Sequence, residues 1–148
     1  PNRHTRRAAE EALAGTARIE LLEPLDYEPM VRLIDSSWLI LSDSGGLQEE
    51  APALGKPLLV LRNVTERPEA LATGNVELVG TDPDRIVAAV AALLDDPRKY
   101  ARMARPAFPF GDGHAAERIA EAIEEWLEER HPHPTPAFTR EEAGPPPD

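Results

Sequence analysis

The chain of 148 residues is long enough for one domain of ordinary size, and its net charge of −11 argues against a nucleic-acid partner, because a polyanion needs a basic binding face. It has no cysteine, which excludes a disulfide framework and a thiolate metal site and is compatible with the cytoplasm. No apolar run approaches the roughly 20 residues of a membrane span, so we expect a soluble protein without a membrane partner.

The first elements in chain order are a helix and a strand. Asn2 or Thr5 can cap a helix that continues through about Ala14, and Gly15 is suited to end it. Residues 18–22 then predict a strand, which the proline that follows stops.

The middle of the chain continues this alternation. Residues 27–35 space their apolar side chains on one helical face, and the continuous apolar run 38–41 predicts a strand buried on both faces. A helix is expected to open near Gly45 and to end at Gly55. Further strands are predicted at 58–61 and 76–79.

The last third is predicted to be helical up to a proline-rich tail. Asp82 is an N-cap before a first-turn proline, and it opens a helix that reaches Leu94. Shorter and longer helices are predicted at 97–103 and 115–129, and the tail 131–148 is expected to be disordered, with His131 and His133 too mobile to hold a metal. Strands that alternate with helices predict parallel pairing with right-handed crossovers, hence an α/β sandwich over 1–130.

The stretch after the apolar run 38–41 has the composition of an anion site. Ser44 can cap the helix and donate to a phosphate oxygen, while Gly45 and Gly46 let a bulky ligand approach the backbone. Glu50 follows within the same helix, where its carboxylate can accept hydrogen bonds from sugar hydroxyls. The simpler interpretation is a helix cap and tight turn, with Glu49 and Glu50 as a solvated pair.

A second loop, at 62–69, follows the next predicted strand and carries arginines. Carboxyl ends of neighbouring parallel strands meet at one sheet edge, so Arg67 is expected beside the Ser44 loop. Amides from one loop and a guanidinium from the other fit a diphosphate. The alternative is that Arg67 forms a surface ion pair with Glu66 or Glu69.

An ordered series of motifs resembles the non-hydrolysing UDP-N-acetylglucosamine 2-epimerase family. The motifs are Ser42-Asp43-Ser44-Gly45-Gly46-Leu47-Gln48-Glu49-Glu50-Ala51-Pro52, Gly55-Lys56-Pro57, Thr65-Glu66-Arg67-Pro68-Glu69, Val79-Gly80-Thr81-Asp82, Phe110-Gly111-Asp112-Gly113 and Ala116-Glu117-Arg118-Ile119. The family usually has Asn-Pro-Tyr where this chain has Phe108-Pro109-Phe110. That departure removes an amide and a phenol from the loop. Asp112 within it is more simply a turn residue than a catalytic acid.

The resemblance implies two Rossmann-like domains of the glycosyltransferase-B type, with UDP held mainly by the second. The UDP-binding residues would be Ser44, Gly45 and Gly46 at the diphosphate, Arg67 near it, Glu50 at the ribose, and Leu25 and Tyr27 at the uracil. No cofactor or metal is implied. The implied partners are UDP-N-acetylglucosamine or UDP, an N-terminal domain and, for the whole enzyme, a second copy.

The implied reaction is inversion at C2 of the sugar through elimination and re-addition of UDP, in cell-envelope polysaccharide synthesis. The family's catalytic carboxylates lie in the first domain. We therefore expect this chain to be a C-terminal piece that begins inside the second domain, without its first strands, and that does not epimerise alone. Two alternatives stay open: part of a hydrolysing epimerase or glycosyltransferase, and a non-catalytic module that binds nucleotide sugars.

Overall fold

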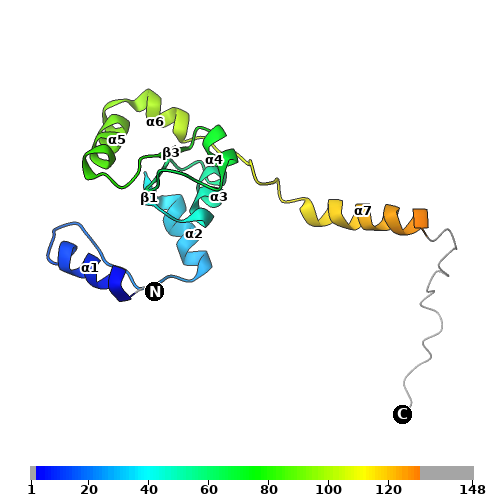
Figure 1. Cartoon of the computed structure of the whole chain (residues 1–148), viewed down its shortest axis with the longest axis horizontal. Coiled ribbons are helices and arrows are strands. Elements are labelled where there is room, and N and C mark those ends of the chain that lie inside the picture. The colour runs from blue at the N-terminus through cyan, green and yellow to red at the C-terminus, as the bar shows by residue number, and fades with distance from the viewer. Residues whose placement is uncertain (1–2, 131–148) are drawn as a thin grey trace, which may run out of the picture. The chain divides into compact units, whose positions relative to one another are not determined.

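The computed structural model describes residues 3–130, and its contacts divide the chain into two compact units, Pro1–Phe110 and Gly111–Asp148 (Figure 1). The first unit contains, in order, α1 (Arg3–Leu13), α2 (Tyr27–Ser36), β1 (Ile40–Ser42), α3 (Gly45–Ala53), β2 (Leu58–Val60), α4 (Pro68–Ala72), β3 (Val76–Leu78), α5 (Pro83–Asp95) and α6 (Pro97–Met103). In the second unit the described helix is α7 (Ala115–Arg130). The predicted cap Asn2 and the predicted tail 131–148 lie outside the described residues, and Thr5 lies inside α1.

The three strands form one parallel sheet in the order β1-β2-β3, which confirms the predicted α/β class. The register pairs Ser42 with Val60 and Val60 with Leu78, so the last residues of the three strands are level. The loops that follow β1 and β2 therefore start side by side at the same edge of the sheet. This register places the candidate site.

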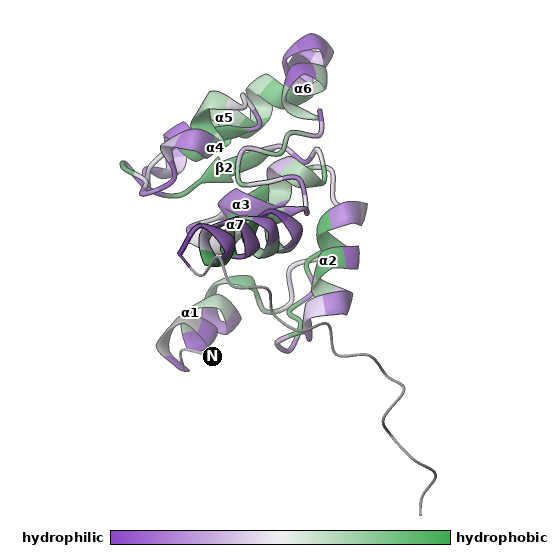
Figure 2. Cartoon of the chain, turned by 90° about the vertical axis from the view of Figure 1, so that its right-hand side faces the viewer, coloured by the Kyte–Doolittle hydropathy of each residue, from purple (hydrophilic) through white to green (hydrophobic). Residues whose placement is uncertain are grey.

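The core lies on both faces of β2, whose residues are all fully buried. Leu58 and Val60 pack with Ala51 of α3 and Ala70 of α4. Leu59 points to the opposite face, where it packs with residues of α5 and α6. Figure 2 shows β2 as a hydrophobic strand among more mixed helices. Because successive side chains of a strand alternate between faces, one short apolar strand holds three layers together.

The predicted helix starts at Asp82 and Pro97 are confirmed. The Asp82 carboxylate accepts from the backbone N–H of Arg85 at 3.0 Å, and the Asp96 carboxylate accepts from Arg98 and Lys99. These three bonds supply partners for backbone donors that a helix start leaves free. Within residues 3–130, no helix combines the length and apolarity that crossing a bilayer requires.

The predicted strand at 18–22 is wrong, because this segment has no regular secondary structure. Arg18 has a φ of 66°, in the left-handed region, which interrupts an extended run at its first residue. Ile19, Leu21 and Leu22 are about half exposed, and the described sheet provides no neighbouring strand for them. An apolar segment without a partner for its backbone groups does not form a strand.

The run 38–41 was expected to be buried on both faces, and this is also wrong. The strand starts at Ile40 and lies at the edge of the described sheet, where Leu41 is 47% exposed. Trp38 stacks on Tyr100, with ring centroids 4.6 Å apart and planes 2° apart, and the Tyr100 hydroxyl donates to the Trp38 carbonyl. An edge strand has fewer covering layers than a central one, and apolar content alone does not distinguish the two.

We expect the two neighbouring leucines of α5 to differ sharply in their effect on stability. Leu93 is 1% exposed and packs in the core, whereas Leu94 is 63% exposed. Leu93→Ala should lower the free energy of unfolding by about 2–5 kcal/mol, because it removes transfer energy and leaves a cavity. Leu94→Ala should change it by less than about 1 kcal/mol. Urea unfolding followed by circular dichroism measures both, and equal losses would contradict this packing.

Candidate functional site

The start of α3 presents the backbone groups that an anion needs. Ser44 occupies the N-cap position in an extended conformation, and its N–H donates to the Ser42 hydroxyl at 3.0 Å. Its own hydroxyl makes no capping hydrogen bond, so the expected side-chain cap is absent and Ser44 is exposed. The first N–H groups of a helix lack partners within the helix and carry its positive end. The loop therefore has donors available for a ligand.

A buried glutamine joins this loop to the loop that follows β2. Gln48 is fully buried on α3, and its amide nitrogen donates to the Ser44 carbonyl at 3.2 Å. The Thr65 hydroxyl donates to the Gln48 side-chain oxygen at 2.5 Å, and the Thr65 oxygen accepts from the Arg67 N–H at 3.0 Å. Three hydrogen bonds thus link the backbone of Ser44 to that of Arg67. The structure brings the two predicted loops together.

Gln48 and Thr65 were not singled out from the sequence. A signal for Gln48 did exist, because the buried residues of α3 are Gln48, Ala51 and Pro52, at the i, i+3, i+4 spacing of one helical face. A glutamine on the buried face must find partners for its amide, since an unpaired buried polar group is costly. The sequence does not reveal that its partner is Thr65, 17 residues away.

The arginines of the second loop are paired with carboxylates. Arg67 donates through Nε to the Glu49 carboxylate on α3, and this bond raises the pKa of Arg67. Arg62 donates to Glu66 Oε2 at 3.1 Å. The expected alternative partners of Arg67 were Glu66 and Glu69, so the ion pair exists but with another residue. Such partly exposed pairs contribute little to stability, and a phosphate can compete for both guanidinium groups.

The two glycines at the start of α3 differ in the space around them. A Cβ on Gly46 would meet only the Ser44 hydroxyl, at 3.8 Å, so a ligand can reach the backbone there. A Cβ on Gly45 would lie 3.0 Å from Oε1 of Glu66. The room that Gly45 leaves is therefore occupied by a carboxylate of the second loop. Glu50, the predicted ribose ligand, is half-buried further along α3.

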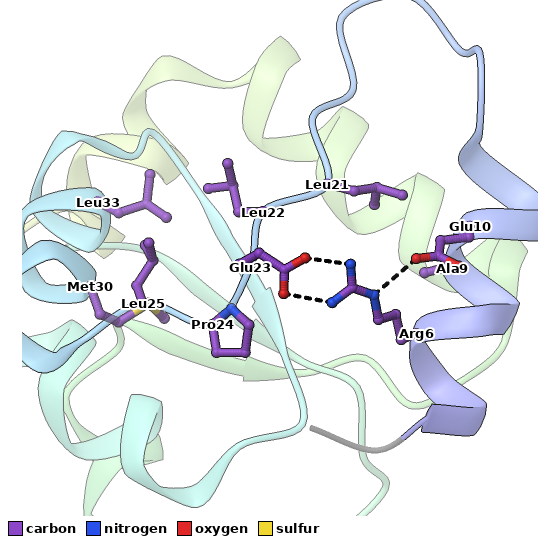
Figure 3. Close-up of a pocket in the computed structure, with 10 residues that line it drawn as sticks. All are labelled: Arg6, Ala9, Glu10, Leu21, Leu22, Glu23, Pro24, Leu25, Met30 and Leu33. Atoms are coloured by element: carbon purple, nitrogen blue, oxygen red, sulfur yellow. Dashed lines mark hydrogen bonds and ion pairs between the residues drawn. The ribbon is translucent and has the colours of Figure 1, made fainter.

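Leu25, one of the two residues predicted at the uracil, lines a pocket of about 420 Å³ (Figure 3). The walls are mostly apolar and include Met30 of α2. At one side Arg6 of α1 donates to both carboxylate oxygens of Glu23, at 2.6 and 2.5 Å, which lowers the pKa of Glu23. Tyr27, the other predicted residue, begins α2 and is 72% exposed. The roles of both residues stay predictions.

The Gly-Asp-Gly motif belongs to the second unit. Arg118 of α7 donates through both terminal nitrogens to the Asp112 carboxylate, at 2.8 and 2.6 Å, and Asp112 also accepts from the His114 N–H at 3.2 Å. The Arg118 hydrogen bonds are the largest cause of the lowered pKa of Asp112. A carboxyl held in its ionised form is a poor proton donor. The geometry is that of a turn and helix-start residue.

Comparisons with known proteins agree with one another. Residues 1–124 match the family model described as UDP-N-acetylglucosamine 2-epimerase. The UDP-N-acetylglucosamine 2-epimerase of Escherichia coli K12 is 50% identical over 122 residues, which cover 82% of this chain and 32% of that protein.

Solved structures share the fold as well as the sequence. The UDP-GlcNAc 2-epimerase of Neisseria meningitidis, solved bound to UDP-GlcNAc, has a TM-score of 0.80 and 44% identity over 84% of this chain and 33% of that one. The S. aureus MnaA–UDP co-structure also has a TM-score of 0.80 and 44% identity, covering 86% and 35%. The chain therefore spans about one third of the length of these relatives.

We expect Gln48 and Thr65 to depend on each other. Gln48→Met and Thr65→Val should each lower the free energy of unfolding by about 1–3 kcal/mol, because each leaves a polar partner unpaired. The double variant should lose less than the sum, with a coupling of about 0.5–3 kcal/mol. Urea unfolding of the four proteins gives this coupling. Thr81→Val, at an exposed threonine, is the control and should change stability by less than about 0.5 kcal/mol. Additive losses would show that the two side chains act separately.

Proposed function

The chain belongs to the UDP-N-acetylglucosamine 2-epimerase family, and we propose that it forms the part of such an enzyme that holds UDP. The observation that supports this most directly is the Gln48–Thr65 connection between the two loops at the ends of β1 and β2. It keeps the free N–H groups of α3 beside a loop with two arginines. The N. meningitidis relative, which shares this fold, was solved bound to UDP-GlcNAc.

Each part of the proposed site matches one part of UDP. The exposed Ser44 hydroxyl and the N–H groups of Gly45 and Gly46 would receive the diphosphate oxygens, because donors and the positive helix end converge there. Arg67 would shift from Glu49 toward a phosphate, for which its fork of donors is suited. Glu50 would accept from the ribose hydroxyls, and the segment from Leu25 to Tyr27 would border the uracil.

The reaction we propose for the whole enzyme follows from where the diphosphate is held. Removal of the proton at C2 of the sugar and departure of UDP with the electron pair of the C1–O bond leave a glycal. Return of UDP to C1 and of a proton to the other face of C2 gives the epimer. Donors around the diphosphate favour the departure of UDP, because they stabilise the negative charge of the leaving group. The carboxylates that move the protons would come from outside these 148 residues.

The wider biological setting stays a prediction. We propose that the enzyme acts in the cytoplasm and supplies an activated sugar to cell-envelope polysaccharide synthesis. We also propose that the whole enzyme forms a homodimer. The nucleotide site, in contrast, can be tested on this chain directly.

Loss of a diphosphate contact should weaken binding of UDP. Ser44→Ala and Arg67→Ala should each cost about 1–3 kcal/mol of binding free energy, because each removes a charge-assisted hydrogen bond. Calorimetric titration of the chain with UDP measures this. Matched controls are Ser36→Ala on α2 and Arg102→Ala on α6, both at exposed positions outside the two loops. Unchanged affinity in both Ser44→Ala and Arg67→Ala would refute the site assignment.

The chain by itself should not interconvert UDP-N-acetylglucosamine and UDP-N-acetylmannosamine. Activity should return when the remaining two thirds of the E. coli relative is supplied in trans. In D₂O the product should carry deuterium at C2, because the proton is exchanged during elimination; proton NMR detects both the epimer and the label. Epimerisation by the chain alone would contradict the proposed division of roles. Release of free sugar and UDP would identify a hydrolysing enzyme instead.

A further inference from the structure

Glu66 lies where the proposed function places the diphosphate. Its Oε1 atom is 3.0 Å from the position that a Cβ of Gly45 would take, at the start of α3. Its Oε2 atom accepts from Arg62 Nη1 at 3.1 Å. The Oε1 atom also accepts from Arg62 Nη1, at 3.4 Å, so the carboxylate lies between the start of α3 and the Arg62 guanidinium. This is the arrangement of donors that a phosphate group would also use.

The location is favourable for a negative charge for two independent reasons. The N-terminal end of α3 is positive and has N–H groups without partners in the helix. Arg62 and Arg67 add guanidinium charges nearby. The hydrogen bond from the backbone N–H of Glu66 has the largest effect on the Glu66 carboxyl, and together with these two charges it lowers the pKa of that carboxyl. Glu66 is therefore ionised at neutral pH.

A diphosphate at the start of α3 would meet this carboxylate. Two like charges at close range repel each other, and the same donors cannot serve both fully. Glu66 is exposed and lies in a loop before the short helix α4, so its side chain has solvent to move into. Departure of Glu66 would also leave Arg62 without its carboxylate partner.

On this basis, and resting on the proposed UDP site, we propose that Glu66 is an internal stand-in for the diphosphate. In the ligand-free chain its carboxylate occupies the space over Gly45. When UDP binds, the diphosphate displaces it, and Arg62 changes partner from Glu66 to a phosphate oxygen. Glu66 thereby lowers the affinity for UDP, and Arg62 becomes a phosphate ligand in addition to Arg67. An anion therefore lies at the start of α3 both in the ligand-free chain and in the complex with UDP.

The alternative is that Glu66 favours the binding of UDP. If its carboxylate only holds Arg62 in position for the ligand, its removal should weaken UDP binding. The two roles thus predict changes of opposite sign for the same variant. The charge of Glu66 can be removed with little change in shape by Glu66→Gln.

The test is calorimetric titration of three proteins with UDP and with uridine. Glu66→Gln should bind UDP about three- to tenfold more tightly than the unchanged chain, because one repulsive charge near the diphosphate is removed. Its affinity for uridine, which has no phosphate, should not change. The control is Glu77→Gln, which also removes a carboxylate from an ion pair, with Lys99, but on β3. It should bind UDP like the unchanged chain.

Equal or weaker binding of UDP by Glu66→Gln would overturn the stand-in role. A second measurement tests the exchange of Glu66 for an anion without UDP. If none of the three proteins binds UDP, the proposed function fails, and inorganic pyrophosphate then tests the exchange alone through the backbone N–H resonances of Gly45 and Gly46. Larger shifts of these resonances in Glu66→Gln than in the unchanged chain, at the same pyrophosphate concentration, support the exchange. Equal shifts contradict it.

Discussion

The buried amide of Gln48 joins the loops that follow β1 and β2. Its two ends are used at once, one by the Ser44 carbonyl and the other by the Thr65 hydroxyl. This is possible only because the parallel register ends β1 and β2 at the same level, with Ser42 opposite Val60. The packing of β2 against helices on both faces holds that register. Core, sheet and site are therefore linked through one side chain.

Charge at the site is balanced locally, although the whole chain is strongly acidic. Arg67 is paired with Glu49 and Arg62 with Glu66, so both of these guanidinium groups in the loop after β2 already have a carboxylate partner. Such exposed pairs are weak and exchange readily. In the proposed site, a phosphate would take the place of these carboxylates and would not fill an empty positive pocket. The net charge of the chain argues against a polyanionic partner, but it says little about a small anion at one site, because there the local arrangement decides.

Much of the fold was predictable because local rules and tertiary packing agree. The α5 and α6 starts follow from Asp-Pro pairs, and both carboxylates do cap their helices. The failures occur where tertiary context decides. Residues 18–22 are apolar but have no strand beside them in the described sheet, and Leu41 is exposed because β1 is at an edge. The helix Pro68–Ala72, missed within the loop 62–69, has five residues and is too short to show a helical period.

In the candidate site, too, the local sequence predicts some features, and tertiary context decides others. The sequence predicts that glycine at position 45 lets a ligand approach the backbone, and this role stays a prediction. What approaches in the ligand-free chain is Glu66, 21 positions further along, and no local pattern gives that pairing. A carboxylate and a phosphate accept from the same donors, so a loop with donors suited to a phosphate also attracts the protein's own acidic side chains. A glycine-rich anion motif therefore specifies a location for negative charge, and its occupant is set by competition between the ligand and the chain itself.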